Sequence, residues 1–372
     1  MNNSQPVFIS PDLGRTAEGV KVLLTRLNLY GRHLATIKDD PESKLIIFGG
    51  IDERQYKLIE NGNYSYLNVI RISKPTRNLL LFAIKSRLRI HKSNFNPSIL
   101  VASDLYVGFF TCFLITRLLG LRSRIQISIH GLLTRLGDSS FKAFFRKMYV
   151  GFALRYSDSI RVVSTDLLKN TSAEFYISER KFFVSPVPVD IPSLREAKRC
   201  GKVIAFIGRM HIERGIDEWI EIVHLLSLRR QDFDLFIIGD GPLHDKFIAE
   251  LGALPNDVKV HFFGHLSRND LEKRWEDVKI LLSSAPAEGY GLTLREALST
   301  ETFVCARDSQ GSQLLASEIP QVIKVYKSPD EAVSVIENFL DGEFPEGVSE
   351  RFIENLRSAN SASLNALANS WI

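Results

Sequence analysis

Short apolar runs recur along the chain, and most of them end at glycine or at a small polar residue. In the first half, runs that suit buried strands cover residues 7–10, 45–48, 66–72, 98–102, 125–129, 159–163 and 181–184. Apolar residues at helical spacing lie between them, at 20–27, 105–119 and 140–156. This alternation of strand, loop and helix, without solenoid repeats, predicts a parallel, doubly wound α/β sheet.

The second half of the chain repeats this rhythm. Its predicted strands cover 202–207, 233–238, 258–263 and 280–283, and helical patterns begin at Ile216 and Thr293. A polar, proline-bearing stretch at 186–200 separates the two halves. We therefore expect two Rossmann-like domains, residues 1–190 and 191–355, and a Ser/Asn/Ala-rich tail, 356–372, that could pack back toward the first domain.

Composition supports a folded protein without a metal or a disulfide framework. Of the 372 residues, 45% are hydrophobic and 24% are charged, which excludes a disordered chain. The three cysteines, Cys112, Cys200 and Cys305, are far apart, and this pattern favours a reducing compartment. We find no secretory signal, and the longest apolar stretch, 105–116, is shorter than the ~20 residues that span a bilayer. We therefore expect a cytoplasmic protein.

Positively and negatively charged residues are distributed unevenly between the two halves of the chain. Residues 1–195 hold 28 Lys and Arg against 15 Asp and Glu, whereas residues 196–372 hold 19 against 28. The first half is thus expected to meet an anion, such as a phosphate or a lipid headgroup. Basic residues interleave with apolar ones at 74–92 and at 141–147, which is typical of a helix on anionic lipid or of a buried helix with solvated charges. No aromatic-basic recognition motif appears, so we expect no nucleic-acid partner.

The segment from Glu288 to Ala297, EGYGLTLREA, carries the most specific signal. Thr293 and Glu296 have the spacing of a capping box, which predicts a helix that begins at about Leu294 behind a glycine-bearing loop. The free amides at such a start suit a phosphate. Alternatively, Glu296 only caps the helix and Glu288 is a solvated loop residue.

A second segment, GRMHIERGI, follows a predicted strand and precedes a helix. Its arginines, Arg209 and Arg214, would place two cations at one strand end, where they suit a diphosphate. A basic surface loop is the alternative. The third strand-to-helix turn, GDGP at 239–242, needs no function to explain it.

These segments occur in one order, as FIGRMHIERGID, LFIIGDGPLHDKF and VKVHFFGHLSRNDLEKRWEDVKILLSSAPAEGYGLTLREAL. Over about residues 203–298 the chain resembles the C-terminal half of the family 4 glycosyltransferases. Two glutamates with seven residues between them, Glu288 and Glu296, are the specific part. The resemblance implies the GT-B fold of two facing Rossmann-like domains. It also implies a retaining hexosyltransferase that uses a nucleotide diphosphate sugar as donor substrate. The paired arginines would replace a metal at the diphosphate and no DxD motif appears, so we expect a metal-independent enzyme without a cofactor.

The resemblance also implies roles for single residues. Arg209, and Arg214 in the usual place of a lysine, would contact the donor diphosphate. Glu288 would contact the transferred sugar, and Glu296 would bind the ribose hydroxyls. The remaining donor-binding positions would be Gly264 to Leu266 for the base, the amides of Gly291, Leu292 and Thr293 for the phosphates, and Gly14 in the first half.

The first half resembles the family less closely. His130, in the pair His130-Gly131 after a strand, matches the family's histidine near the transferred sugar, although a structural histidine is the common alternative. We count His130, Glu288 and Arg209 as the candidate catalytic residues. After Glu296 the family usually has a Gly-Gly…Glu stretch, where this chain has ARDSQGSQLLASEIPQVI with only Gly311 in place.

The expected acceptor is a glycan or lipid-linked precursor of a polysaccharide or glycoconjugate, with peripheral contact at the inner face of the membrane. Two other interpretations remain open. The altered stretch after Glu296 would suit a degenerate homologue that acts as a non-catalytic partner. A sugar-nucleotide epimerase on the same fold would need several acids and histidines in its cleft, and the first half is poor in acids. No GxGxxG follows a strand, which disfavours a dinucleotide oxidoreductase.

Overall fold

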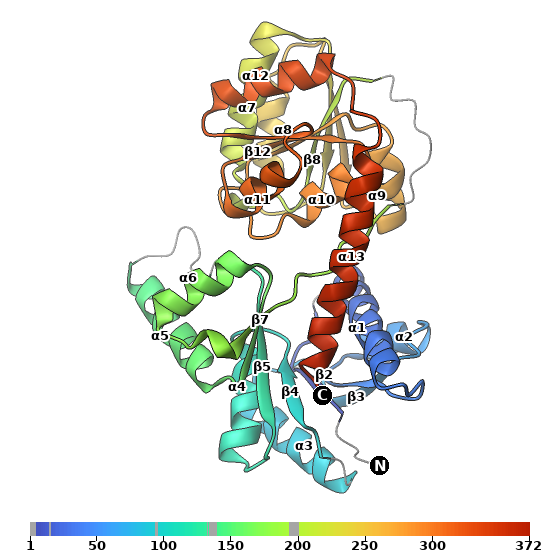
Figure 1. Cartoon of the computed structure of the whole chain (residues 1–372), viewed down its shortest axis with the longest axis vertical. Coiled ribbons are helices and arrows are strands. Elements are labelled where there is room, and N and C mark those ends of the chain that lie inside the picture. The colour runs from blue at the N-terminus through green and yellow to red at the C-terminus, as the bar shows by residue number, and fades with distance from the viewer. Residues whose placement is uncertain (1–4, 15, 94–95, 132, 134–139, 193–200) are drawn as a thin grey trace. The chain divides into compact units, whose positions relative to one another are not determined.

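The protein forms two compact units in a computed structural model that describes residues 5–14, 16–93, 96–131, 133, 140–192 and 201–372. The first unit comprises Met1–Pro186 together with Ser361–Ile372, and the second comprises Val187–Asn360. Each unit contains one parallel sheet with helices packed on it (Figure 1). The prediction of two α/β domains with parallel sheets is thereby confirmed.

The first sheet has the strand order β3-β2-β1-β4-β5-β6-β7. Its strands are β1 Val7–Ser10, β2 Leu45–Gly50, β3 Leu67–Ser73, β4 Ile99–Ala102, β5 Arg124–Ile129, β6 Ser159–Val162 and β7 Phe182–Val184. Its helices are α1 Ala17–Ile37, α2 Glu53–Glu60, α3 Leu79–Lys92, α4 Val107–Phe113, α5 Ser140–Tyr156 and α6 Thr165–Phe175. A π-helical turn, η1 Leu114–Leu118, continues α4, and a 3-10 turn, η2 Glu179–Lys181, precedes β7.

The second sheet has the order β10-β9-β8-β11-β12-β13. Its strands are β8 Val203–Ile207, β9 Asp234–Ile238, β10 Lys259–Gly264, β11 Ile280–Ser283, β12 Phe303–Arg307 and β13 Ile323–Tyr326. Its helices are α7 Ile216–Arg229, α8 His244–Leu251, α9 Arg268–Trp275, α10 Leu292–Leu298, α11 Gln310–Glu318 and α12 Pro329–Asp341, with a 3-10 turn, η3 Ile212–Arg214. The last helix, α13 Val348–Asn369, begins in the second unit, and its final residues belong to the first.

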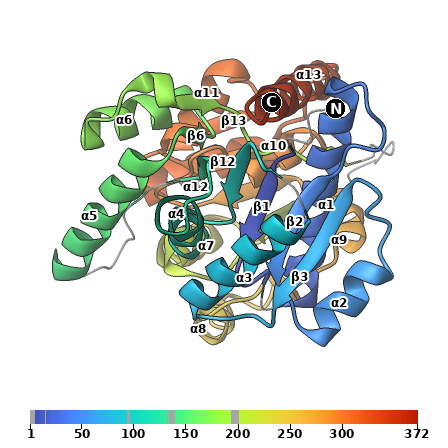
Figure 2. The same ribbon diagram turned by 90° about the horizontal axis from the view of Figure 1, so that it is seen from below.

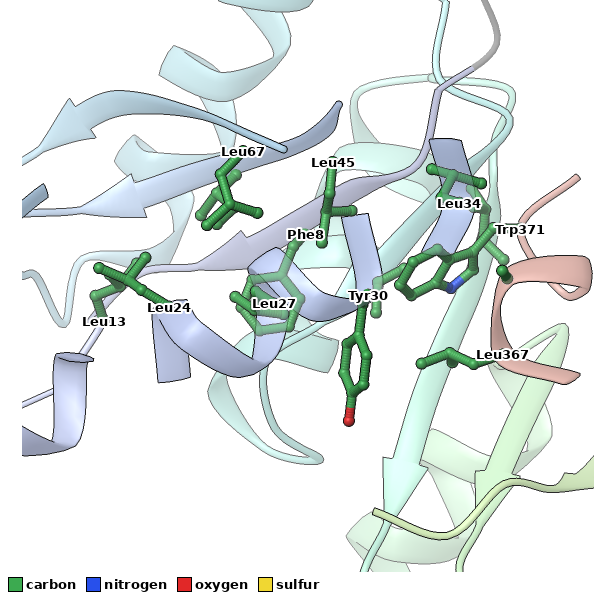
Figure 3. Close-up of a cluster of buried hydrophobic side chains, with 14 of the residues drawn as sticks. Phe8, Leu13, Leu24, Leu27, Tyr30, Leu34, Leu45, Leu67, Leu367 and Trp371 are labelled. Atoms are coloured by element: carbon green, nitrogen blue, oxygen red, sulfur yellow. The ribbon is translucent and has the colours of Figure 1, made fainter. Parts of the chain in front are cut away.

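Apolar side chains cover both faces of the first sheet. The inward face of α1 packs on one of them, and Leu24, Leu34 and Leu45 are fully buried there (Figure 3). Helices α3 and α4 pack against each other and against the sheet (Figure 2). Strands buried on both faces read as continuous apolar runs, which is why the run lengths predicted them.

The polar tail becomes helical because its few apolar residues share one face. Leu367 and Trp371 join the α1 core (Figure 3), as does Ala368. The indole nitrogen of Trp371 donates a hydrogen bond to Gln126 Oε1 at 2.6 Å. Ser185 also bonds Ser363 on α13, so polar contacts support the same docking. Residues 361–372 thus complete the core of the first unit.

We expect Trp371→Ala to lower the free energy of unfolding by about 3–5 kcal/mol. The change leaves a cavity in the core and removes the hydrogen-bond donor of the buried Gln126 side-chain oxygen. Ile372→Ala serves as the matched control, since that side chain is 59% exposed. Denaturant unfolding monitored by circular dichroism measures both changes. Equal stability of the two variants would contradict the role given to Trp371.

Candidate functional site

Loops at the carboxyl ends of β8, β9 and β10 are tied together by their backbones. The Gly208 amide donates to the Ile238 carbonyl at 3.0 Å, and the Gly239 amide donates to the Gly264 carbonyl at 2.8 Å. Gly239 has a φ of +136°, and a Cβ there would lie 1.9 Å from the carbonyl oxygen of Gly208. Only glycine permits this approach, so the GDGP turn supports the loop that presents Arg209.

Arg209 is exposed at the end of β8, next to Met210, which is buried. Within the part of the chain that the structure describes, its guanidinium makes no hydrogen bond or ion pair. Five N–H donors in a fixed fork therefore face solvent at the carboxyl edge of the sheet. An arginine in this state can bind an incoming carboxylate or phosphate without first losing a protein partner.

Arg214 and Glu288, which come from separate motifs, form an ion pair. Arg214 Nη1 lies 2.9 Å from Glu288 Oε2, and the other carboxylate oxygen accepts a bond from the Gly291 amide at 3.1 Å. The two side chains are 38% and 20% exposed. Both oxygens of Glu288 are thus engaged, which holds the carboxylate in one orientation while it remains open to solvent.

This pair spans the topological switch point of the second sheet. Strand β9 lies on one side of β8 and β11 on the other, so the loops after β8 and β11 diverge there. Arg214 belongs to the loop after β8, and Glu288 belongs to the loop after β11. Open α/β sheets bind ligands in the crevice at this point. A small cavity beside it is lined by Arg214, Glu288 and Thr293 together with residues of β8 and β11.

Close backbone contacts hold the two loops against each other. Gly215 has a φ of +63°, and a Cβ there would lie 2.1 Å from the Ser284 carbonyl oxygen. Ser284 Oγ in turn donates to the Arg214 carbonyl at 2.9 Å. Gly215 is therefore required both by its backbone conformation and by the approach of the chain after β11.

The predicted capping box at Thr293 and Glu296 is wrong. Helix α10 begins at Leu292, behind Gly291, which has a φ of +72° and makes no side-chain cap. The helix therefore begins two residues earlier than expected, and Thr293 lies inside its first turn. Of the amides at this helix start, that of Gly291 donates to the Glu288 side chain.

The side chain of Glu296 pairs with Arg268, a residue that the sequence analysis did not single out. Arg268 Nη1 lies 2.8 Å from Glu296 Oε1, and Nη2 donates to the Asp190 carbonyl at 2.9 Å. Glu296 is only 14% exposed. Its burial raises the pKa of the carboxyl group, and Arg268 acts in the opposite direction. Nothing in the local sequence links positions 28 residues apart, so only the fold reveals this pair.

The remaining predicted donor-binding residues lie along the same edge. Gly264 ends β10 with a φ of +62°, and a Cβ added there would have no atom within 4 Å. Leu266 is a half-buried residue just before α9. Leu292 is half-buried at the start of α10. The loop after β10 thus leads directly from the expected base position to Arg268.

The altered segment after Glu296 supports the Glu288 loop. The Gly311 amide donates to the Glu288 carbonyl at 2.8 Å. A Cβ on Gly311 would lie 2.8 Å from that same oxygen and 3.1 Å from the Gly289 carbonyl carbon. Although the stretch departs from the family pattern, its remaining glycine occupies a position where the backbone of α11 touches the candidate site.

In the first unit, Gly14 and His130 follow β1 and β5 at the carboxyl edge of the first sheet. Gly14 has a φ of +147°, and its carbonyl accepts a bond from Gln55 at 2.6 Å. Desolvation by surrounding protein, and then the charges of Arg161 and Arg26, lower the pKa of His130 to about 4. His130 is an exposed residue, and the two cations lower its pKa in the same direction as desolvation does. The imidazole is therefore neutral at pH 7.

Among the described residues, no three His, Cys, Asp or Glu side chains come together as a metal site would require. That the protein works without a metal or cofactor stays a prediction. A search of the described helices also finds none with the length and apolar character of a membrane span.

We expect Arg268→Ala to lower the free energy of unfolding by about 1–3 kcal/mol, because it leaves the buried Glu296 carboxylate without its partner. The double variant Arg268→Ala, Glu296→Gln should recover part of that loss. Lys246→Ala, which breaks an exposed pair with Asp217, is the control and should cost less than about 1 kcal/mol. Additive losses in the double variant would show that the pair carries no coupling.

We expect Gly311→Ala to be destabilising by about 1–3 kcal/mol, since its Cβ would press on the backbone of the Glu288 loop. Gly201→Ala is the matched control, because the nearest atom to a Cβ there lies at an ordinary 3.5 Å. Thermal unfolding compares the two. A Gly311→Ala protein as stable as the control would refute the close contact.

Comparison with known proteins agrees with the geometry. Residues 194–359 match the model of the family described as glycosyl transferases group 1. The chain is 24% identical over 155 residues to the alpha-D-kanosaminyltransferase of Streptomyces kanamyceticus. It is 25% identical over 146 residues to a GDP-mannose-dependent alpha-(1-6)-phosphatidylinositol dimannoside mannosyltransferase of Mycobacterium tuberculosis. These matches cover 41% and 36% of this chain and only 39% and 37% of the relatives' own length.

The fold extends over the whole chain. Anabaena Alr3699/HepE, solved in complex with UDP-glucose, superposes with a TM-score of 0.69 at 14% identity, covering 98% of this chain and 99% of the other. The fold is therefore GT-B. Residues 194–359 are thus similar in sequence to glycosyl transferases group 1, and the chain as a whole shares its fold with Alr3699/HepE.

Proposed function

We propose that the protein is a glycosyltransferase that moves a hexose from a nucleotide diphosphate sugar to an acceptor hydroxyl. The ion pair between Arg214 and Glu288, which spans the switch point of the second sheet beside the unpaired Arg209, carries this proposal. Cations and an oriented carboxylate meet there at the edge where open α/β sheets bind ligands. The sequence relatives are themselves named as glycosyltransferases.

In this proposal the donor lies along the carboxyl edge of the second sheet. Arg209 and Arg214 bind the diphosphate, and the amides of Gly291, Leu292 and Thr293 complete its contacts. Glu288 contacts the transferred sugar in the orientation that Arg214 and Gly291 impose. Glu296 binds the ribose hydroxyls, and the base lies beside Gly264 to Leu266. Gly14 is included among the donor-binding residues because the family resemblance implies it.

The reaction would break the bond between the anomeric carbon and the diphosphate oxygen and form a bond from that carbon to the acceptor oxygen. The departing diphosphate gains negative charge, and the two arginines stabilise that charge where a metal would otherwise act. The acceptor hydroxyl passes its proton to an oxygen of the departing diphosphate in the same step. Retention of the anomeric configuration rests on the resemblance to family 4, and His130, neutral at pH 7, would contact the transferred sugar.

The acceptor is proposed to be a lipid-linked or other glycoconjugate precursor, and the protein to work in the cytoplasm with peripheral contact at the inner membrane face. The excess of Lys and Arg in the first unit supports an anionic acceptor. One sequence relative is named for a lipid glycan acceptor, a phosphatidylinositol dimannoside.

Donor turnover tests the assignment. We expect Arg209→Ala and Glu288→Ala each to lower kcat/KM for sugar transfer or donor hydrolysis by at least about 100-fold, because each removes a group that acts on the developing charge or on the sugar. Glu213→Ala, an exposed carboxylate in the same loop as Arg209, is the control and should leave kcat/KM unchanged. UDP-hexoses and GDP-hexoses are both supplied as donors, and products are separated by mass.

Full activity in both variants would refute the site. Release of an epimerised sugar nucleotide, without transfer or hydrolysis, would favour the epimerase instead. Donor binding without any turnover would favour a non-catalytic partner.

A further inference from the structure

A groove lined with aromatic side chains opens between α5 and the start of α4 in the first unit. Its volume is about 810 Å³, and it is lined by Tyr106, Phe145, Arg146, Met148, Tyr149 and Phe152. Pockets for small organic ligands measure roughly 300–1,000 Å³ and are mostly apolar with a few polar groups. This groove has the same character, with Arg146 as its charged residue.

The groove continues into an exposed apolar stripe on α5. Phe141, Phe144, Phe145 and Met148 lie at the spacing of one helical face, and they are 72%, 59%, 51% and 56% exposed. An exposed Leu or Phe alone needs no explanation, but four on one face form a contiguous patch. Exposing such a patch to water costs free energy. Patches of this kind are typical of a surface that contacts an apolar partner.

Charge around the patch selects an anionic partner. Residues 61–157 contain 15 Lys and Arg but only two acids, Asp104 and Asp138. Helix α5 itself carries Lys142, Arg146, Lys147 and Arg155 and no acidic residue, and of these Lys147 pairs with Glu174 of α6 at 2.9 Å. Asp104 is engaged by the amides of residues 106–108 at the start of α4. An apolar helix face flanked by basic residues is the pattern of a helix that lies in the interface of an anionic bilayer.

The groove also lies next to the carboxyl edge of the first sheet, where parallel α/β sheets bind ligands. Tyr106 follows β4, which stands between β1 and β5 in the sheet, so the groove begins at the carboxyl edge that also carries His130. The sheet changes direction between β1 and β4, which makes this its switch point. Arg146 holds the rim there, with Nη1 at 3.3 Å from the Tyr106 hydroxyl and its guanidinium over that ring.

We propose that the exposed face of α5 binds the surface of an anionic phospholipid bilayer and that the adjoining groove takes a hydrocarbon chain of a lipid from it. The aromatic stripe supplies apolar contact, and Lys142 and Arg146 meet the headgroups. The inference deepens the proposed function, on which it rests only in naming the acceptor class as an anionic lipid.

Vesicle binding tests the inference without any sugar nucleotide. The full chain is sedimented with phosphatidylcholine vesicles that do or do not contain phosphatidylglycerol. We expect binding only to the anionic vesicles and weaker binding at high salt, because the basic contacts are screened. Phe145→Ser with Met148→Ser should weaken binding about tenfold or more, since both side chains leave water on insertion. Tyr176→Ser with Leu228→Ser removes two side chains that are 94% and 82% exposed elsewhere and should bind like wild type.

Lys142→Gln removes one positive charge from α5, and its binding to anionic vesicles tests the contribution of that charge. The control is Lys273→Gln, since Lys273 is a lysine of the second unit that is 73% exposed. Equal thermal unfolding of all variants shows that their folds are intact. Equal binding to neutral and anionic vesicles, or wild-type binding by the Phe145→Ser, Met148→Ser protein, would overturn the proposal. So would a dimer in sedimentation velocity that this double variant abolishes, because the face would then belong to a second copy.

The outcome is separable from that of the proposed function. Arg209→Ala should lose donor turnover and keep vesicle binding. If wild type transfers sugar to a soluble acceptor yet ignores vesicles, the lipid inference fails and the transferase assignment stands.

Discussion

The ion pair between Arg214 and Glu288 is the contact on which the candidate donor site depends. It joins two loops that leave the sheet on opposite sides of its switch point, and it sets the orientation of the carboxylate. Charge attraction alone would not bring these loops so close. Three glycines, Gly215, Gly239 and Gly311, each occupy a place where a Cβ would strike a neighbouring carbonyl oxygen. The site is therefore built from backbone contacts first, and the charged side chains are added to a frame that already fits.

Strand positions could be predicted from the sequence because buried parallel strands are continuous apolar runs, most of which end at glycine or at a small polar residue. The run at 45–48 and the helix at 140–156 correspond to β2 and α5. Strands β12 and β13, and helices α11 and α12, were not predicted. The Ser/Asn/Ala-rich tail is mainly helical because Leu367, Ala368 and Trp371 find a core to pack on, and local composition carries no information about that partner.

The residues of the candidate site could be predicted from the sequence, but their pairings could not. Motif spacing singled out Arg209, Arg214, Glu288 and Glu296, because glycine-bearing loops after strands are local features. Spacing could not show that Arg214 binds Glu288, nor that Arg268 binds Glu296, since those pairs are 74 and 28 residues apart. The predicted capping box is wrong for a related reason. Gly291 adopts a left-handed conformation that begins the helix two residues early, so Thr293 lies in the first turn and not at the N-cap.

The final residues of α13 have a consequence for biosynthesis. During translation the first 186 residues emerge from the ribosome long before Leu367 and Trp371 are synthesised. These two residues fill the core beside α1. Domains usually fold as units while the chain emerges, N-terminal first. Here the nascent first unit must wait, with an apolar gap beside α1, until the entire second unit has been translated. Its maturation is thereby tied to the completion of the second unit, so a chain stalled before residue 361 would leave that gap open to chaperones.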